Sequence, residues 1–315
     1  MHSHDKYPSD PFTRTRQVVH ARFSFPGTIS RTILVATMLL AHPFAGAQAD
    51  LAKRMADAGR SDGNWYFSWG YSRQQYADSD IHVRQPGEGS DFVVHRANAS
   101  DNPTGLVHIV RSIFTLNFTA PQENVRVGRF VDRDNTFAIE FSLDHSKYNT
   151  NDGQVAHVTG TVEGGAYDGP MTLDRQHFQY ALHNGLNHVM INGVWFHHLR
   201  NVSLGREPGD LQLVSRLGGG LLIPHAQNTI LGHDNSAETG SKGKSPCCSR
   251  HDWWQVNGWT VGTEVGVRYA MTRSVYAELT QKFAYGKLHG VPVYHGLASQ
   301  GIWMSEQVLS LGMLF

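Results

Sequence analysis

The chain has 315 residues and equal numbers of basic and acidic side chains, so its formal net charge is zero. This balance, without a basic patch, argues against a nucleic-acid partner. Glycine is frequent at 32 residues, and beyond the N-terminal region no run of about 18 apolar residues predicts a membrane-spanning helix.

The first 49 residues have the pattern of a Sec signal peptide. Arg31 precedes a short apolar run at 33–41, and the small residues Ala45, Ala47 and Ala49 follow it. We expect cleavage after Ala49, or alternatively after Ala47, because a charged segment, a short apolar segment and an A-x-A end are typical of exported precursors. A membrane anchor is the alternative, which the shortness of the run disfavours. Residues 50–63 would then form a short periplasmic segment.

Alternation of apolar and polar residues predicts β-strands with one half-exposed face along the rest of the chain. In the first strand, for example, Trp65, Phe67 and Trp69 share one face, and in the last strand Leu309 and Leu311 share a face with Phe315. Eight strands are predicted in chain order: 65–71, 124–131, 136–148, 186–199, 211–223, 259–271, 275–287 and a last strand ending at residue 315.

Short and long connections alternate between these strands. Segments 132–135, 200–210 and 272–274 are short, whereas 77–123, 149–185, 224–258 and 288–302 are long. Outer-membrane barrels combine short periplasmic turns with long extracellular loops. The sequence therefore predicts an all-β protein, a single closed antiparallel transmembrane barrel over 64–315 with four long extracellular loops.

Two alternatives to this barrel stay open. Ten strands are the alternative count, and Phe92-Val93-Val94 is a stretch that could extend the sheet above the membrane. A soluble secreted β-sandwich also has many short strands. That fold would leave Trp65, Phe67, Trp69 and Tyr71 exposed to solvent together, which soluble proteins avoid.

The signal peptide, the Gly-aromatic strands and the closing pattern Leu309-Ser310-Leu311-Gly312-Met313-Leu314-Phe315 resemble those of small bacterial outer-membrane β-barrel proteins. That superfamily includes porin-like, OmpW-like and lipid A-modifying members. The resemblance implies that Phe315 is the signal read by the barrel-assembly machinery. It also implies outer-membrane lipid and lipopolysaccharide as partners and an outer-membrane location after Sec export.

Charged residues recur on the face of the strands that is predicted to point inward. An eight-stranded barrel has an interior that side chains just fill, and unpaired buried charges are heavily penalised, so we expect a polar plug of paired charges. A narrow ion path is the alternative. The nine residues are Arg126, Glu140, Asp144, Arg216, Glu264, Arg268, Glu278, Lys282 and Glu306.

Histidine is frequent in the predicted loops, and imidazole is the commonest metal ligand. His225, His233 and His251 are weak candidates for capture of zinc or copper, but no histidine pair has a diagnostic metal-site spacing. We expect solvated loop histidines, and no cofactor.

Asp144, His145 and Ser146 lie at the upper end of a predicted strand and are weak catalytic candidates. A serine hydrolase needs a serine activated by a histidine that a third group orients. Lipid A 3-O-deacylases, to which the barrel pattern is similar, carry such a pair on the lipid face with an H-x-S-N spacing. Here His145 and Ser146 are adjacent and should face opposite sides of the strand.

The sequence thus favours an envelope barrel without catalysis, for passage or binding of a small solute or apolar ligand, or for membrane integrity. Lipid A acyl hydrolysis is the second hypothesis, and surface metal capture is the third. The oligomeric state cannot be read from the sequence.

Overall fold

The computed structural model describes residues 65–101, 122–199, 208–239 and 254–315. The chain divides into two units, Met1–Pro43 and Phe44–Phe315, and every described residue belongs to the second. The predicted signal peptide, the segment 50–63 and His251 therefore lie outside the described residues. Within the described ranges, no helix is long and apolar enough to cross a membrane.

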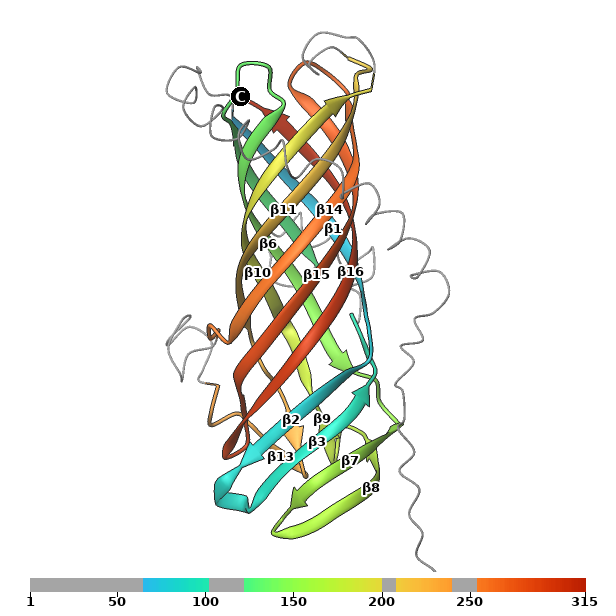
Figure 1. Ribbon diagram of the computed structural model, residues 1–315, viewed down its shortest axis with the longest axis vertical. Coiled ribbons are helices and arrows are strands. Elements are labelled where there is room, and N and C mark those ends of the chain that lie inside the picture. Colours follow the sequence, from blue (N-terminus) through green and yellow to red (C-terminus); the bar gives the residue numbers. More distant parts are fainter. Residues whose placement is uncertain (1–64, 102–121, 200–207, 240–253) are drawn as a thin grey trace, which may run out of the picture. The chain divides into compact units, whose positions relative to one another are not determined.

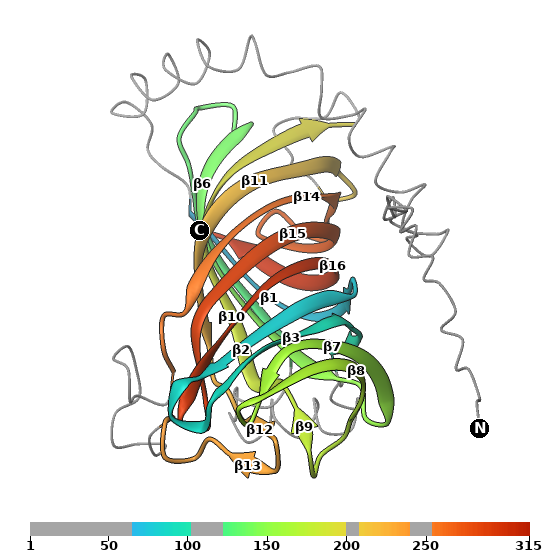
Figure 2. The ribbon, with the colours of Figure 1, turned by 60° about the horizontal axis from the view of Figure 1, so that its bottom comes forward.

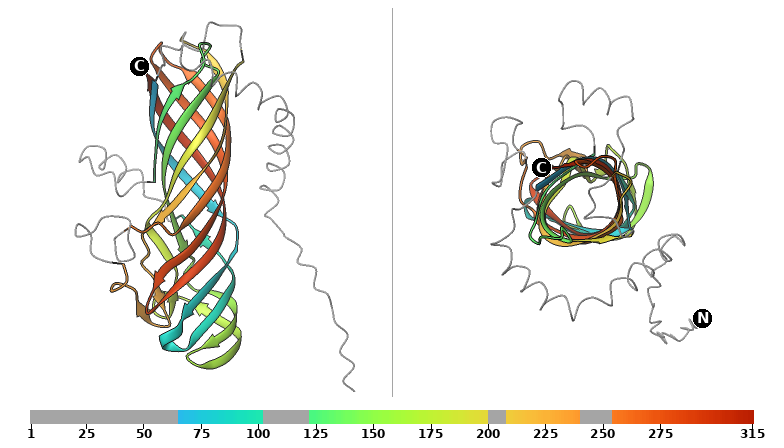
Figure 3. Two further views of the ribbon diagram at one scale, coloured as in Figure 1. Left: turned by 60° about the vertical axis from the view of Figure 1, so that its left-hand side comes forward. Right: turned by 90° about the horizontal axis from the view of Figure 1, so that it is seen from above.

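Eight antiparallel strands form a closed ring, seen end-on in Figure 3. Each strand pairs with the next one named here, and the last pairs back with the first, so the predicted eight-stranded barrel is confirmed. The strands are β1 (Trp65–Tyr76), β5 (Glu123–Phe130), β6 (Phe137–Thr150), β10 (Ala181–His198), β11 (Leu211–Pro224), β14 (Gly258–Ala270), β15 (Val275–Val293) and β16 (Gly296–Leu314).

The two ends of the barrel sequence close the ring. β1 pairs with β16 from Tyr66 opposite Leu314 to Tyr76 opposite Met304. At the seam the Trp65 amide donates to the Phe315 carbonyl at 2.8 Å, and the Phe315 amide donates to the Trp65 carbonyl at 2.9 Å. The last residue of the chain thus takes part in the main-chain closure of the barrel.

Phe315 has a main-chain role in closing the seam and a predicted side-chain role as the assembly signal, and two variants separate these roles. In lipid vesicles, deletion of Phe315 should slow the appearance of the folded, heat-modifiable band in gels, because both closing hydrogen bonds are lost. The variant Phe315→Ala keeps these two main-chain hydrogen bonds and should fold at nearly the normal rate. In cells, both variants should accumulate less folded protein if the aromatic side chain is the assembly signal. Normal assembly of Phe315→Ala in cells would contradict the signal.

Three of the four predicted long loops are long connections, and the fourth prediction is wrong. Segment 288–302 belongs to β15 and β16, which extend as a hairpin until only Tyr294 and His295 separate them. A shift of register between Leu288 and Val291 accommodates Gly290, which has a φ of 65°. Gly290 therefore marks an irregularity within the hairpin.

The long connections fold into further strands at the end of the barrel opposite Phe315 (Figures 1 and 2). β2 pairs with the first part of β16, and β3, β7 and β8 follow it in the same sheet, so the prediction that Phe92-Val93-Val94 extends the sheet is confirmed. β4 lies between β1 and β6, and β9, β12 and β13 form a small separate sheet. The bounds are β2 (Ser79–Gln85), β3 (Ser90–Ala97), β4 (Ala99–Ser100), β7 (Gln154–Val162), β8 (Gly165–Leu173), β9 (Phe178–Gln179), β12 (Thr229–Ile230) and β13 (His233–Asp234), with a 3₁₀ turn at Pro86–Glu88.

Apolar side chains fill both ends of the barrel interior. Near the Phe315 end, a buried cluster includes Tyr66, Phe130 and Phe196. At the other end, a larger cluster joins barrel residues such as Leu288 to Phe92 of β3 and to other residues of the added strands. The added strands are therefore packed onto the barrel through one continuous apolar core. We refer to them, with their connections, as the cap layer.

Candidate functional site

Two features of the barrel are candidates for function, and the first is a cluster of charges in its interior. The nine charged residues that the alternation placed inside are all buried there, each with at most 4% of its surface exposed. They come from six of the eight strands: Arg126 (β5), Glu140 and Asp144 (β6), Arg216 (β11), Glu264 and Arg268 (β14), Glu278 and Lys282 (β15) and Glu306 (β16).

Arg216 joins three carboxylates from three different strands. Its Nε donates to Glu140 Oε1 at 3.1 Å, its Nη1 to Glu264 Oε1 at 3.2 Å and its Nη2 to Glu278 Oε1 at 2.7 Å. A planar guanidinium presents its donors in a fixed fork, so one arginine can serve several carboxylates. Among the four cations of the cluster, Arg216 consequently contacts the most carboxylates.

Two other arginines complete the pairing of these carboxylates. Arg126 donates to Glu140 Oε1 and Glu264 Oε2, each at 3.0 Å. Arg268 donates from Nε to Glu278 Oε2 at 2.7 Å, and its guanidinium carbon lies 3.8 Å from the centre of the Tyr276 ring. Cation–π contacts of this kind are strongest where water is excluded.

A second group of charges lies beside the first. Lys282 donates to Asp144, and its Nζ is 3.7 Å from Glu306 Oε2. Glu306 also accepts from Gln74 Nε2 at 2.8 Å, and Asp144 accepts from Asn124. Among the described residues, the cluster thus contains five carboxylates and four cations, linked by ion pairs and hydrogen bonds.

Sequence reasoning missed the uncharged members of this cluster. The Tyr66 hydroxyl donates to Glu140 Oε2 at 2.8 Å. Its ring lies over Gly128, where a Cβ atom would be only 2.1 Å from a ring carbon. Asn192 Nδ2 donates to Glu140 Oε1 at 3.2 Å. The pairing of an aromatic residue with glycine across β1 and β5 was the signal available in the sequence.

The cluster leaves little free space. A void beside Arg126, Arg216 and Lys282 has a volume of about 10 Å³, which is close to the minimum for one water molecule. Because the apolar clusters lie on either side of the charges along the barrel, the described interior is a packed plug.

The candidate triad Asp144, His145 and Ser146 is divided between the two faces of β6. Asp144 and Ser146 point inward and are fully buried, and the Ser146 hydroxyl donates to the Leu186 carbonyl at 2.7 Å. His145 points outward, into a pocket described below. The structure therefore does not bring this serine and histidine together.

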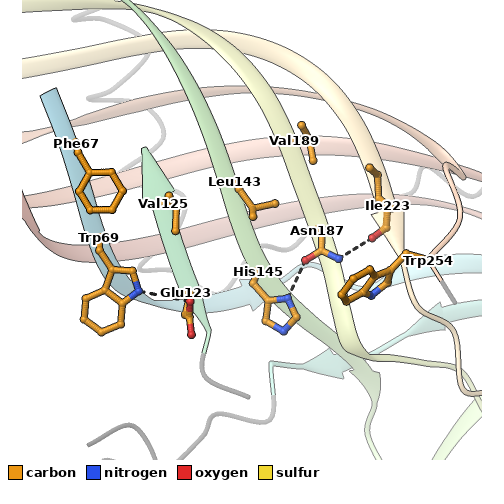
Figure 4. A pocket seen from close by; sticks show the side chains of 10 residues that line it. All are labelled: Phe67, Trp69, Glu123, Val125, Leu143, His145, Asn187, Val189, Ile223 and Trp254. Carbon is orange, nitrogen blue, oxygen red and sulfur yellow. Dashed lines mark hydrogen bonds between the residues drawn. The ribbon is translucent and has the colours of Figure 1, made fainter. Parts of the chain in front are cut away.

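The second candidate feature is a pocket on the outer wall of the barrel, with a volume of about 530 Å³ (Figure 4). Most of its wall is apolar, and three polar side chains lie along one edge. No hydroxyl or thiol side chain lines it among the described residues. We call it the lateral pocket; its lining consists of Phe67, Trp69, Glu123, Val125, Leu143, His145, Asn187, Val189, Ile223 and Trp254.

The polar edge is a row across three neighbouring strands. His145 is directly opposite Asn187, and the pairing of Asn124 with Asp144 places Glu123 next to His145 on the same face. Glu123, His145 and Asn187 are each more than nine-tenths buried. One step toward the middle of the barrel, the corresponding row consists of Val125, Leu143 and Val189. The pocket therefore lies where the outer wall changes from apolar to polar.

Hydrogen bonds fix the orientation of this row. Asn187 Nδ2 donates to the Ile223 carbonyl at 2.9 Å, so its Oδ1 is left to accept from His145 Nδ1 at 2.7 Å. In a neutral imidazole the other nitrogen, Nε2, is then an acceptor. Glu123 Oε2 accepts from Trp69 Nε1 at 3.4 Å. Among the described side chains that line this pocket, His145 Nε2, Glu123 Oε1 and Trp254 Nε1 are buried without a hydrogen-bond partner.

Gly185 permits this arrangement. It has a φ of 129°, and a Cβ atom there would lie 2.7 Å from His145 Cε1 and 2.8 Å from Asn187 Nδ2. The register of β10 against β6 shifts between Leu182 and Leu186, which gives the strand this local shape. A side chain at residue 185 would displace the imidazole.

Several surface histidines of the cap layer are paired with acids. His82 Nε2 is 2.6 Å from Asp91 Oδ1, His157 Nε2 is 3.0 Å from Asp168 Oδ1, and the hydrogen bond with His82 lowers the pKa of Asp91. His233 stacks on Tyr294 with ring centres 4.5 Å apart, and His225 is buried. The described residues hold no group of three or more His, Cys, Asp or Glu side chains arranged for a metal ion.

Comparisons with known proteins give matches only among solved structures. No family model matches the chain, and no curated protein matches it. Ail of Yersinia pestis matches with 12% identity over 81% of this chain and 100% of that chain, at a TM-score of 0.32. The outer-membrane protein OprG of Pseudomonas aeruginosa matches with 11% identity over 80% of this chain and 96% of that chain, at a TM-score of 0.37.

The outer-membrane protease OmpT of Escherichia coli also matches, with 8% identity over 80% of this chain and 96% of that chain, at a TM-score of 0.30. All three TM-scores are below 0.5, so the barrel assignment depends on the strand pairings described above. Those pairings make the chain a closed, eight-stranded antiparallel β-barrel.

Proposed function

We propose that this protein is a Sec-exported outer-membrane barrel that does not conduct and that acts through its outer surfaces. The observation that carries this proposal is the packed, charge-paired plug between two apolar layers. A barrel filled in this way serves as a membrane anchor, and the cap layer and the outer wall are the parts left to contact ligands or partners.

The outer wall has the composition expected of a membrane-facing surface. Apolar side chains on the strands remain more than one-third exposed, among them Phe67, Ile139, Phe141, Ile191, Leu217, Val261, Val267, Leu279, Leu309 and Leu311. Aromatic residues lie toward both ends: the Tyr285 ring contacts Trp259 and Trp303 near the cap layer, and Trp65 and Phe315 lie at the seam. Outer-membrane barrels have such an apolar band between aromatic girdles.

The conductance of the purified protein tests the plug. Reconstituted in planar bilayers, it should give no large single-channel steps, because opening a path would expose paired buried charges and their apolar cover. Folded protein is verified by heat-modifiable migration in the same preparation. A large and stable single-channel conductance would contradict the proposal and would favour a porin-like protein.

Labelling of cysteines in intact cells tests the orientation. In a Cys247→Ser, Cys248→Ser background, Val155→Cys places a thiol on the cap layer and Val275→Cys places one at the β14–β15 turn at the opposite end. A membrane-impermeant maleimide should label only Val155→Cys in intact cells and both variants after lysis. Labelling of Val275→Cys alone would mean the reverse orientation, and recovery of a soluble periplasmic protein would contradict the membrane location.

A further inference from the structure

The geometry points to the lateral pocket as a binding site for a membrane lipid whose headgroup carries a primary ammonium. The inference depends on the proposed membrane location, and it goes beyond the anchor function by assigning a ligand to the outer wall. The pocket opens on the lipid-facing side, and its polar edge is at the boundary of the apolar band.

The unpartnered atoms define what the ligand must supply. Glu123 Oε1 and His145 Nε2 are buried acceptors, so the ligand must provide at least two N–H or O–H donors. Leaving such groups unsatisfied is unfavourable, since burial removes them from water without replacing their hydrogen bonds. Trp254 Nε1 is a buried donor in the same pocket and requires one acceptor, such as an ester or phosphate oxygen.

The charge of the pocket selects among headgroups. Among the described residues, its lining contains one carboxylate and neither lysine nor arginine, whereas recognition of a phosphate or another anion usually uses those residues. A primary ammonium has three donors and a positive charge, which fits the Glu123 carboxylate and the His145 lone pair. The indole rings of Trp69 and Trp254 also line the pocket, and aromatic faces attract ammonium groups.

The apolar part of the pocket wall would contact an acyl chain of the lipid. Val125, Leu143 and Val189 form the adjoining apolar row, and Phe67 extends it along β1. A volume of about 530 Å³ is within the usual range of small-molecule sites. The headgroup would thus lie at the polar row with the first part of one acyl chain below it.

Binding of three lipids with identical acyl chains tests the assignment. Folded full-length protein in a neutral detergent is titrated with phosphatidylethanolamine, phosphatidylcholine and phosphatidylglycerol, and the dissociation constants are measured by native mass spectrometry. Phosphatidylcholine keeps the positive charge but lacks N–H donors. We expect phosphatidylethanolamine to bind at least 10-fold more tightly than either of the others.

Variants locate the site and separate it from general lipid affinity. Glu123→Gln and His145→Phe should each reduce the preference for phosphatidylethanolamine over phosphatidylcholine to about 2-fold. Asp168→Asn removes a carboxylate from the exposed cap layer and should leave the preference unchanged. Heat-modifiable migration verifies that each variant is folded.

Three outcomes would overturn the assignment. They are equal binding of phosphatidylethanolamine and phosphatidylcholine by the unmodified protein, tighter binding of phosphatidylglycerol, and an undiminished preference in Glu123→Gln. None of them alters the conductance result, so failure of the lipid site and failure of the non-conducting anchor are distinguishable.

Discussion

Replacement of Arg216 by methionine is expected to lower the free energy of unfolding by about 3–5 kcal/mol, which is typical when one partner of a buried ion pair is removed. The guanidinium of Arg216 donates to Glu140, Glu264 and Glu278, so its loss leaves three buried carboxylates with fewer cations. The loss should be measured by urea unfolding in lipid vesicles.

Two further variants make this expectation specific. Arg129→Met is the matched control, because Arg129 is exposed on the outer side of β5 and lies over the Trp65 ring. It should change the unfolding free energy by much less. Adding Glu264→Gln to Arg216→Met should recover part of the loss, because without Arg216 the carboxylates of Glu140 and Glu264 share the single cation Arg126. Equal losses in Arg216→Met and Arg129→Met would mean that the charge cluster does not stabilise the barrel.

Substitution of Ile191 by arginine should destabilise the protein by about 2–4 kcal/mol, the range observed for a basic residue at the lipid-facing midplane of a barrel. Ile191 points outward from β10 beside Phe141 of β6, and 66% of its surface is left exposed by the protein. The same urea unfolding assay in vesicles measures the effect.

Val155→Arg is the control for this substitution. Val155 is also β-branched, 65% exposed and in a strand, but β7 belongs to the cap layer. If the cap layer is in water, the change should be within about 0.5 kcal/mol, as for an ordinary surface substitution. Similar losses at both positions would mean that the lipid boundary has been misplaced.

Much of the barrel could be predicted because a strand has a period of two. Once the apolar face of β6 is known from Ile139 and Phe141, Glu140 must point inward, and the same reasoning applies to every strand. The alternation does not give the stagger of one strand against the next. Consequently the sequence indicated that Arg216 needs partners but could not show that Glu140, Glu264 and Glu278 are those partners.

The lateral pocket could not have been predicted for the same reason. His145 was noticed, but only as the neighbour of Ser146, which faces the other way. Its actual neighbours, Glu123 and Asn187, are 22 and 42 positions away in the sequence and become adjacent only through the pairing of β5, β6 and β10. Trp254 comes from a connection that has no alternation at all.

The charged interior also has a consequence for the way the strands find one another. A strand that pairs one residue out of place turns its inward face toward lipid, so a slip of β6 would move Glu140 and Asp144 into the apolar band and Phe141 into the plug. Every strand that supplies a charge carries this penalty. The charged interior therefore favours the native register of the strands over registers that are shifted by one residue.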